Sequence, residues 1–245
     1  MVRGVDDDFA ALREYVASYS LQHFGTDVAA TQNLKSAHKV YLPLLHLWAQ
    51  TRLLSSKKEL LIAGTPITAS SPAFPHIKEA VSDIGSGLSC CVHGGYKAGH
   101  MCLRSSIENF LRFICGPYDA KAMTTKSIYD LFSVASTALP FAGSRKNYLN
   151  SLRDTYVQLC KYSHSASLKH MSGVEALSHF RTHHSSAFRE WIKFANSIVD
   201  AMASIIVLEC PNVYLGAHFK TKEILELIVP TPVRRTVLEG QFKKK

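Results

Sequence analysis

The most informative stretch of the chain is LNSLRDTYVQLCKYSHSASLKHM, residues 149–171. Its first half places Leu152, Tyr156 and Leu159 at helical spacing and so predicts an amphipathic core helix. Its second half changes abruptly to charged and polar residues, with His164 among them. A polar cluster at the end of a core helix is a place where chemistry or recognition can occur.

Apolar residues at helical spacing continue on both sides of this stretch. Four long helices are predicted at residues 76–93, 99–115, 144–164 and 188–209, and glycine, proline or polar breaks separate them. Strand signals are nearly absent. We therefore predict a mainly α fold with a four-helix bundle at its centre.

The chain before the bundle predicts two further helices, at residues 6–24 and 34–54. Pro43 lies inside the second helix and is expected to kink or split it, because proline removes a helical hydrogen bond. Residues 57–73 are ambiguous, since they begin like a short strand or a helical turn and end as a loop rich in proline and serine.

This loop suggests a division of the chain into three parts. They are an N-terminal helical extension (1–70), the helical bundle (71–211), and a C-terminal extension with a basic tail (212–245). Within the last part, residues 214–219 are expected to be extended, and the tail is expected to be only partly ordered.

The composition favours a folded protein with an anionic partner. The chain has 245 residues, of which 47% are hydrophobic, so it can bury the core of one large domain or two small ones. Its formal net charge of +9 favours nucleic acid as a partner. The alternative is a basic surface that only contacts solvent.

The cysteines and the first residues indicate a reducing compartment. All six cysteines fall within apolar helical patterns, and none shows a CxxC spacing. The N-terminus is acidic and amphipathic, unlike a secretion signal. The apolar run 197–210 contains Asp200 and is too short to cross a bilayer. We expect a cytoplasmic protein with free, buried thiols and no membrane partner.

Three segments together resemble the HEPN-like superfamily. They are AGHMCLRSSIENFLRFIC (98–115), YVQLCKYSHSAS (156–167) and the long apolar helix that follows. Members of the superfamily are four-helix bundles, typically with an Arg and a Glu on the second helix and a His at the end of the third. Arg104, Glu108 and His164 occupy these places here.

Many members of this superfamily are metal-independent ribonucleases of toxin–antitoxin and antiphage systems, usually dimeric. Their catalytic signature is an Arg followed by four to six residues and then the His. The resemblance implies His164 as the acid/base and Lys161 and Arg153 as phosphate ligands. Arg153 precedes His164 by eleven positions, however, and Lys161, at three positions, lacks the planar fork of arginine.

The resemblance also suggests supporting residues and partners. Five residues are expected to support the third helix: Arg104, Glu108, Tyr156, Ser163 and Ser165. The Arg104–Glu108 pair could equally be a surface ion pair.

The predicted function is a metal-independent endoribonuclease of a bacterial defence module, without a cofactor. Its partners would be RNA, a second copy of the chain or an antitoxin. The alternative is a non-catalytic protein that binds RNA or another protein, as a regulator or scaffold.

Two other constellations have alternative explanations. In SHFRTHH (178–184), His179 and His183 have a spacing that can hold zinc, but no third ligand is evident. We favour a polar helix face, on which Arg181, His183 and His184 are possible phosphate contacts. A cysteine nucleophile paired with His93 is conceivable at Cys90 or Cys91. Adjacent residues on a helix point about 100° apart, so at most one of the two cysteines can face a given site, and we favour core thiols.

Overall fold

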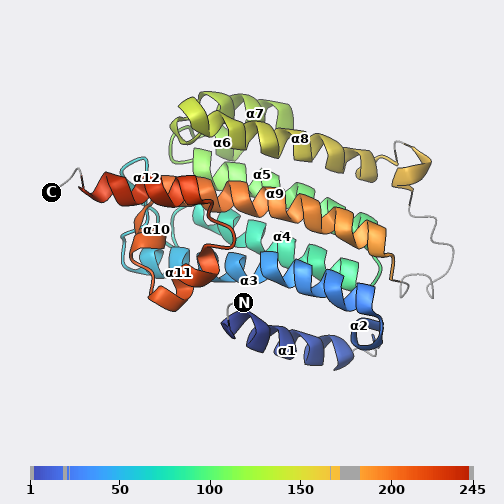
Figure 1. The fold of residues 1–245 in the computed structure, drawn as a ribbon. Helices are drawn as coiled ribbons and strands as arrows, with labels where there is room; N and C mark the ends of the chain where they lie inside the picture. The colour runs from blue at the N-terminus through green and yellow to red at the C-terminus, as the bar shows by residue number, and fades with distance from the viewer. Residues whose placement is uncertain (1–2, 19–20, 22, 166, 172–182, 243–245) are drawn as a thin grey trace.

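The computed structural model describes residues 3–18, 21, 23–165, 167–171 and 183–242 (Figure 1). The predicted mainly α fold is confirmed. The α-helices of the described chain are α1 (Arg3–Ser18), α2 (His23–Thr26), α3 (Val28–Ser56), α4 (Phe74–Val92), α5 (Tyr96–Cys115), α6 (Lys121–Thr124), α7 (Ile128–Thr137), α8 (Lys146–Ser163), α9 (Ser185–Glu209), α10 (Asn212–Leu215), α11 (Phe219–Leu225) and α12 (Thr231–Phe242). The remaining elements are short: the 3-10 helices η1 (Leu139–Phe141), η2 (Gly143–Arg145) and η3 (Leu168–His170), and the strands β1 (Leu61–Ile62) and β2 (Thr65–Pro66).

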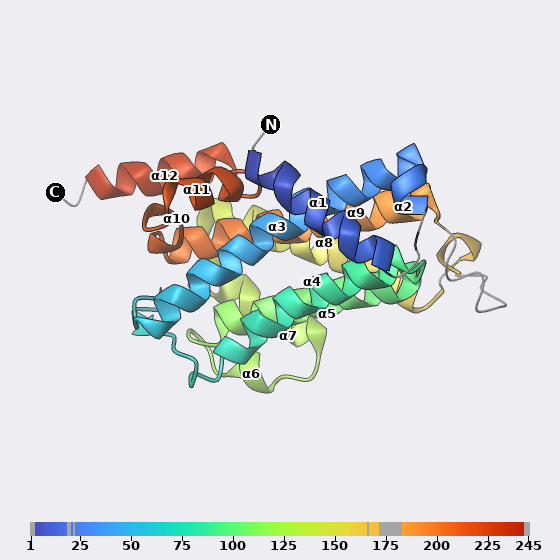
Figure 2. The same ribbon diagram turned by 90° about the horizontal axis from the view of Figure 1, so that it is seen from below.

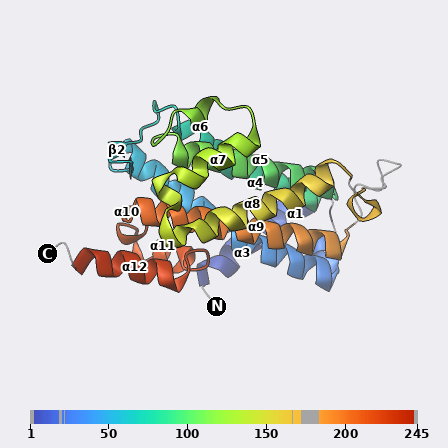
Figure 3. The same cartoon turned by 90° about the horizontal axis from the view of Figure 1, so that it is seen from above.

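The four predicted bundle helices correspond to α4, α5, α8 and α9, with ends within a few residues of those predicted. Helices α4 and α5 form an antiparallel hairpin, and α9 packs against α3, α5 and α8. In Figure 1, α8 lies on one side of α5 and α9, and α3 and α4 lie on the other. Figure 3 shows α6 and α7 at the end of α8 that is far from residues 167–171.

The N-terminal part differs from the prediction in two ways. The first predicted helix is two helices, α1 and α2, and α1 packs on α3 (Figure 2). Pro43 does not split α3, which is continuous from Val28 to Ser56 and begins with the Asp27 side chain accepting from the Ala30 N–H. The neighbours Leu42 and Leu44 are both buried, and this packing on either side offsets the hydrogen bond that Pro43 cannot donate.

The ambiguous segment 57–73 contains a short antiparallel hairpin rather than a helical turn. Ile62 pairs with Thr65 across a two-residue turn. Both turn residues have positive φ, 55° at Ala63 and 70° at Gly64. Such a turn matches the twist of a tight hairpin, which explains why the strand alternative is the one observed.

The expectation of an extended segment at residues 214–219 is wrong. Residues 212–215 form α10, and the tail continues into α11 and α12. Helix α12 packs on α9 and buries Val233 and Val237. Apolar residues four apart on one helical face provide that contact, so most of the basic tail belongs to the folded protein.

One hydrophobic core joins all three predicted parts of the chain. A single cluster of buried residues extends from Phe9 in α1 through Leu44 in α3 and Trp191 in α9 to Val237 in α12. Within the described chain, α9 alone is long and apolar enough to cross a membrane, and two thirds of its most apolar window is buried inside the protein (67%). It therefore has the surroundings of a core helix.

Two glycines, Gly87 and Gly99, let α4 and α5 approach each other closely in this core. A Cβ atom at Gly99 of α5 would lie 2.6 Å from Cys91 Sγ and 3.0 Å from the Gly87 carbonyl oxygen. The indole Nε1–H of Trp191 donates to the Gly99 carbonyl oxygen at 3.1 Å. Helices α4, α5 and α9 thus meet at one point where there is no room for a side chain.

We predict that Gly99→Ala lowers the free energy of unfolding by about 1–2 kcal/mol, because overpacking outweighs the better helix propensity of alanine. Denaturant unfolding measures this change. Gly240→Ala is the matched control, because nothing lies within 4 Å of its Cβ position in α12, and it should stabilise the protein slightly. Equal stabilisation by both variants would contradict the close contact.

Candidate functional site at the end of the helical bundle

The polar cluster that follows the central helix lies where α8 ends. His164 is the C-cap residue of α8, and its N–H donates to the Cys160 carbonyl oxygen at 3.1 Å. Its side chain is exposed. Ser165 follows with φ of +46°, a left-handed conformation that ends helices and is unusual for residues other than glycine. The sequence change therefore marks a sharp helix terminus with an exposed imidazole.

Two lysines from different helices lie beside this terminus. Lys97 Nζ in the first turn of α5 donates to Ser165 Oγ at 2.8 Å, and Lys161 Nζ donates to Gln158 Oε1 at 2.8 Å. We call Lys97, Lys161 and His164 the basic cluster. The hydrogen-bond partners of both lysines are neutral oxygens, which a phosphate oxygen can replace without separating an ion pair.

The sequence analysis missed Lys97. It lies on the predicted helix 99–115 only if that helix begins three residues earlier, as α5 does at Tyr96. Because α5 and α8 pack together and run in opposite directions, the start of one adjoins the end of the other (Figure 1). The sequence could have indicated this position, because neighbouring antiparallel helices in an up-and-down bundle place the first turn of one beside the last turn of the other.

Arg153 is not part of the basic cluster. It precedes His164 by eleven positions, which correspond to about 16 Å along a helix axis. Its exposed side chain extends to α7, where the guanidinium lies 5.3 Å from the Phe132 ring centroid and Nη2 donates to the Phe132 carbonyl oxygen at 3.5 Å. Of the three predicted catalytic residues, the structure brings together Lys161 and His164.

The predicted supporting residues form one network between α5 and α8. The Tyr156 hydroxyl accepts a hydrogen bond from Arg104 Nε at 2.7 Å and donates one to Glu108 Oε1 at 2.9 Å. Arg104 and Glu108 are themselves 3.5 Å apart, with side chains 32% exposed. Burial, and then the Glu108 carboxylate, raise the pKa of Tyr156, so the hydroxyl stays protonated and can donate. The pair is therefore more than a surface ion pair, because it joins two helices through a buried tyrosine.

The two predicted serines have different surroundings. Ser165 is the partner of Lys97, as described above. The Ser163 hydroxyl is buried and has no hydrogen-bond partner among the described residues. Ser163 therefore does not add an exposed group to the basic cluster.

A buried histidine lies behind the basic cluster. The His100 ring stacks on Tyr162 with centroids 4.1 Å apart and planes 5° apart. His100 Nδ1–H donates to the Tyr96 carbonyl oxygen at 2.7 Å, which leaves Nε2 as the unprotonated nitrogen of the neutral ring. Nε2 is buried and has no partner among the described residues, and burial lowers the His100 pKa. The sequence analysis gave this residue no role.

Of the histidines before α9, His183 and His184 precede the helix and do not lie on one. Arg181 and His179 lie outside the described residues. His183 packs against His23 of α2, with ring centroids 5.8 Å apart, and burial lowers its pKa. His184 is exposed, and its N–H donates to the Tyr96 hydroxyl at 2.8 Å. Of the possible phosphate contacts, His184 is thus exposed and His183 is half-buried against α2.

The described part of the chain contains no group of three or more possible metal ligands.

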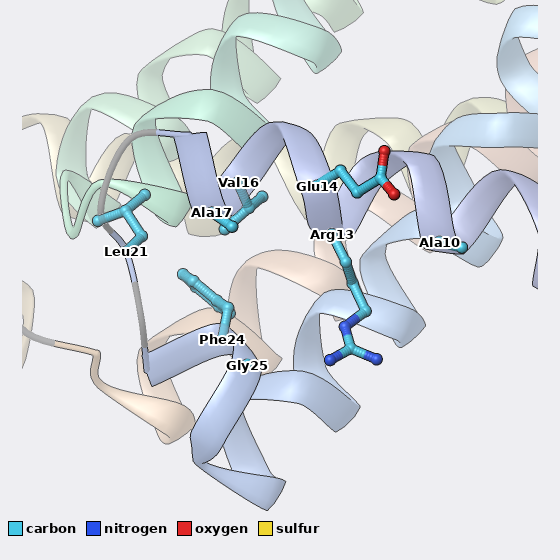
Figure 4. A pocket seen from close by; sticks show the side chains of 8 residues that line it. All are labelled: Ala10, Arg13, Glu14, Val16, Ala17, Leu21, Phe24 and Gly25. Atoms are coloured by element: carbon cyan, nitrogen blue, oxygen red, sulfur yellow. The ribbon is translucent and has the colours of Figure 1, made fainter.

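A separate hollow lies between α1 and α2 (Figure 4). Its volume is about 340 Å³, and its lining is mainly apolar, with Phe24 pointing toward Leu21. Arg13 and Glu14 also line it. The hollow contains none of the predicted site residues, and its open apolar shape does not indicate a specific ligand.

Comparison with protein-family models, with curated proteins and with solved structures found no match for this chain. Its function therefore has to be inferred from the geometry of its own residues.

We predict that Tyr156→Phe lowers the free energy of unfolding by about 1–2 kcal/mol, because two hydrogen bonds between α5 and α8 are lost. Tyr129→Phe is the control, since Tyr129 is 84% exposed on α7 and should lose almost nothing. If Tyr156→Phe were as stable as the control, the network would not hold the two helices together.

We also predict that His100 makes stability depend on pH. An unfolded histidine takes up its proton near pH 6.5, and buried His100 does so only at lower pH, so the unfolded state binds more protons below pH 6.5. Stability should therefore fall as the pH drops from 7 to 5, by at most about 1.4 kcal/mol per pH unit from this group. Unfolding of His100→Phe should show a shallower fall, while His164→Asn, a change at an exposed ring, keeps the wild-type slope.

Proposed function

We propose that this chain is a HEPN-like RNA-binding protein that holds RNA phosphates at the basic cluster. The observation that carries the proposal is the position of Lys97 and Lys161. They come from two helices to one end of the bundle, and each donates to a neutral oxygen. By contrast, Arg104 and Arg145 are paired with Glu108 and Glu209.

The charge of the whole chain supports the same partner. A net charge of +9 attracts a polyanion from a distance and accelerates encounter, whatever its sequence. Phosphate contacts by lysine are of this sequence-independent kind. RNA with accessible phosphates is thus a better candidate than a small neutral ligand.

The HEPN-like assignment rests on the resemblance together with the positions of three residues. Arg104 and Glu108 lie on the second bundle helix, α5, and His164 lies at the end of the third, α8. With this assignment we also propose the cellular setting of that superfamily, a bacterial defence or toxin–antitoxin module. A second copy of the chain or an antitoxin would be its protein partner.

The exposed ring of His164 favours a stronger form of the proposal, a metal-independent endoribonuclease. An exposed imidazole at a phosphate site can move a proton to or from the ribose 2′-OH or the leaving oxygen. Lys161, one helical turn away, would then stabilise the negative charge that develops on the non-bridging phosphate oxygens. Arg153 is too far along α8 to reach the same phosphate, so a nuclease built on this chain would use lysine where the superfamily uses arginine.

We predict that Lys97→Ala and Lys161→Ala each weaken binding of a fluorescent single-stranded RNA by roughly three- to tenfold at low salt. Each should also reduce the slope of log affinity against log salt by about 0.7, the value for one lost phosphate contact on a single strand. The control is Lys121→Ala, an exposed lysine on α6, away from the end of α8. If all three variants bound alike, the basic cluster would not be the RNA site.

Purified wild-type protein and a His164 variant test the endoribonuclease form of the proposal. His164→Ala should keep RNA binding close to wild type and lose cleavage of total RNA, as well as any arrest of bacterial growth on expression. If wild-type protein binds RNA and leaves it intact, the non-catalytic form of the proposal stands and the nuclease form fails.

A further inference from the structure

The hairpin of α4 and α5 contains four of the six cysteines, and Cys115 at the end of α5 is buried. Cys91 is buried, as expected from the sequence, whereas Cys90 and Cys102 are only half-buried. The expectation that all thiols are buried is therefore wrong for this pair. Both half-buried residues lie on the seam between the two helices, one on each side.

Small residues bring the two helices close together along this seam. A Cβ at Gly87 would lie 3.3 Å from the Cβ of Cys102, and a Cβ at Gly95 would lie 3.7 Å from the Cβ of Cys90. The Cys90 thiol lies near enough to Cys102 to help raise the pKa of that thiol. Two sulfurs on facing helices whose backbones approach this closely need little backbone movement to be joined.

The register of the hairpin supports this pairing. Asn109 Nδ2 donates to Asp83 Oδ2 at 3.1 Å across the same seam. Cys90 lies seven residues after Asp83, and Cys102 lies seven residues before Asn109. Seven residues are two helical turns, so both pairs stand on the same face of the hairpin. Cys90 and Cys102 therefore face each other as Asp83 and Asn109 do.

Cys91 is not an alternative partner. It points about 100° away from Cys90 around α4. Its Sγ fills the space beside Gly99, only 2.6 Å from where a Cβ would be. Burial raises its pKa well above the ordinary value for a thiol, so it forms little thiolate. Its position inside the core separates it from the half-buried pair.

We propose that Cys90 and Cys102 are a redox modification site that closes to a disulfide on reaction with hydrogen peroxide. The Cys90 thiol gives up its proton, and the thiolate attacks one peroxide oxygen. The O–O bond breaks, Cys90 becomes a sulfenic acid, and the leaving hydroxide takes up a proton to become water. The Cys102 sulfur then attacks the Cys90 sulfur, the S–O bond breaks, and the leaving hydroxide takes the Cys102 thiol proton to become the second water. Two thiols and one peroxide give one disulfide and two waters, with both sulfurs oxidised and the peroxide reduced.

The order of the two steps follows from the surroundings of Cys102. Burial, together with the Cys90 thiol and the Asp83 carboxylate, raises its pKa to about 11. It is therefore the weaker first nucleophile and the resolving residue. The closed loop would span residues 91–101 and include Lys97, so oxidation would restrain the first turn of α5. The site itself does not depend on the proposed function.

Intact mass and peptide mapping test the proposal on the full chain. Reduced protein treated with dilute peroxide should lose the mass of two hydrogens. Trypsin, which cuts after Lys78, Lys97 and Arg104, should then release peptides 79–97 and 98–104 as one linked species. The disulfide should raise the thermal unfolding midpoint by about 5 °C, and dithiothreitol should reverse the change.

Three variants make the result specific. Cys90→Ser and Cys102→Ser should each lose the linked species and the rise in unfolding midpoint. Cys160→Ser, which removes another half-buried thiol, should behave like wild type. A linked species that persists in Cys90→Ser would assign the bond to Cys91. That result would overturn the proposal. The proposal would also fail if Cys90 and Cys102 stayed unlinked at a peroxide concentration that already oxidises Cys160.

Discussion

The contact between the Trp191 indole and the Gly99 carbonyl oxygen is the constraint on which the arrangement of the bundle depends. The hydrogen bond fastens α9 to α5, and the absence of a side chain at Gly99 lets α4 approach from the other side. The hairpin of α4 and α5 and the distant helix α9 therefore have a fixed mutual position. Helix α8 is then held to α5 by the Tyr156 network, which sets where α8 ends and what its last residues can reach.

The sequence was sufficient for the helices of the bundle because their apolar residues repeat at helical spacing over long stretches. It was insufficient where tertiary packing overrides a local signal. Pro43 is tolerated because its neighbours Leu42 and Leu44 are buried on a long helix. The sequence of residues 214–219 taken alone predicts an extended segment. In the structure these residues join α10 to α11, because the chain folds back over α3.

The candidate site was predictable only in part, for a related reason. Lys161 and His164 are neighbours on one helix, so their proximity follows from sequence spacing alone. Lys97 is 67 residues away from His164, and its place beside α8 follows from the topology of the bundle. Arg153 shows the reverse case, because a place on α8 does not bring it within reach of His164 when the two are eleven positions apart.

The antiparallel packing of α5 and α8 also determines where the electrostatic field at the basic cluster comes from. A helix carries a partial negative charge at its last turn and a partial positive charge at its first turn. The end of α8 and the start of α5 lie together, so these backbone contributions largely cancel. The proposed attraction of an anion to this place would therefore come mainly from side chains. Its strength can change in evolution one substitution at a time, while the bundle beneath remains the same.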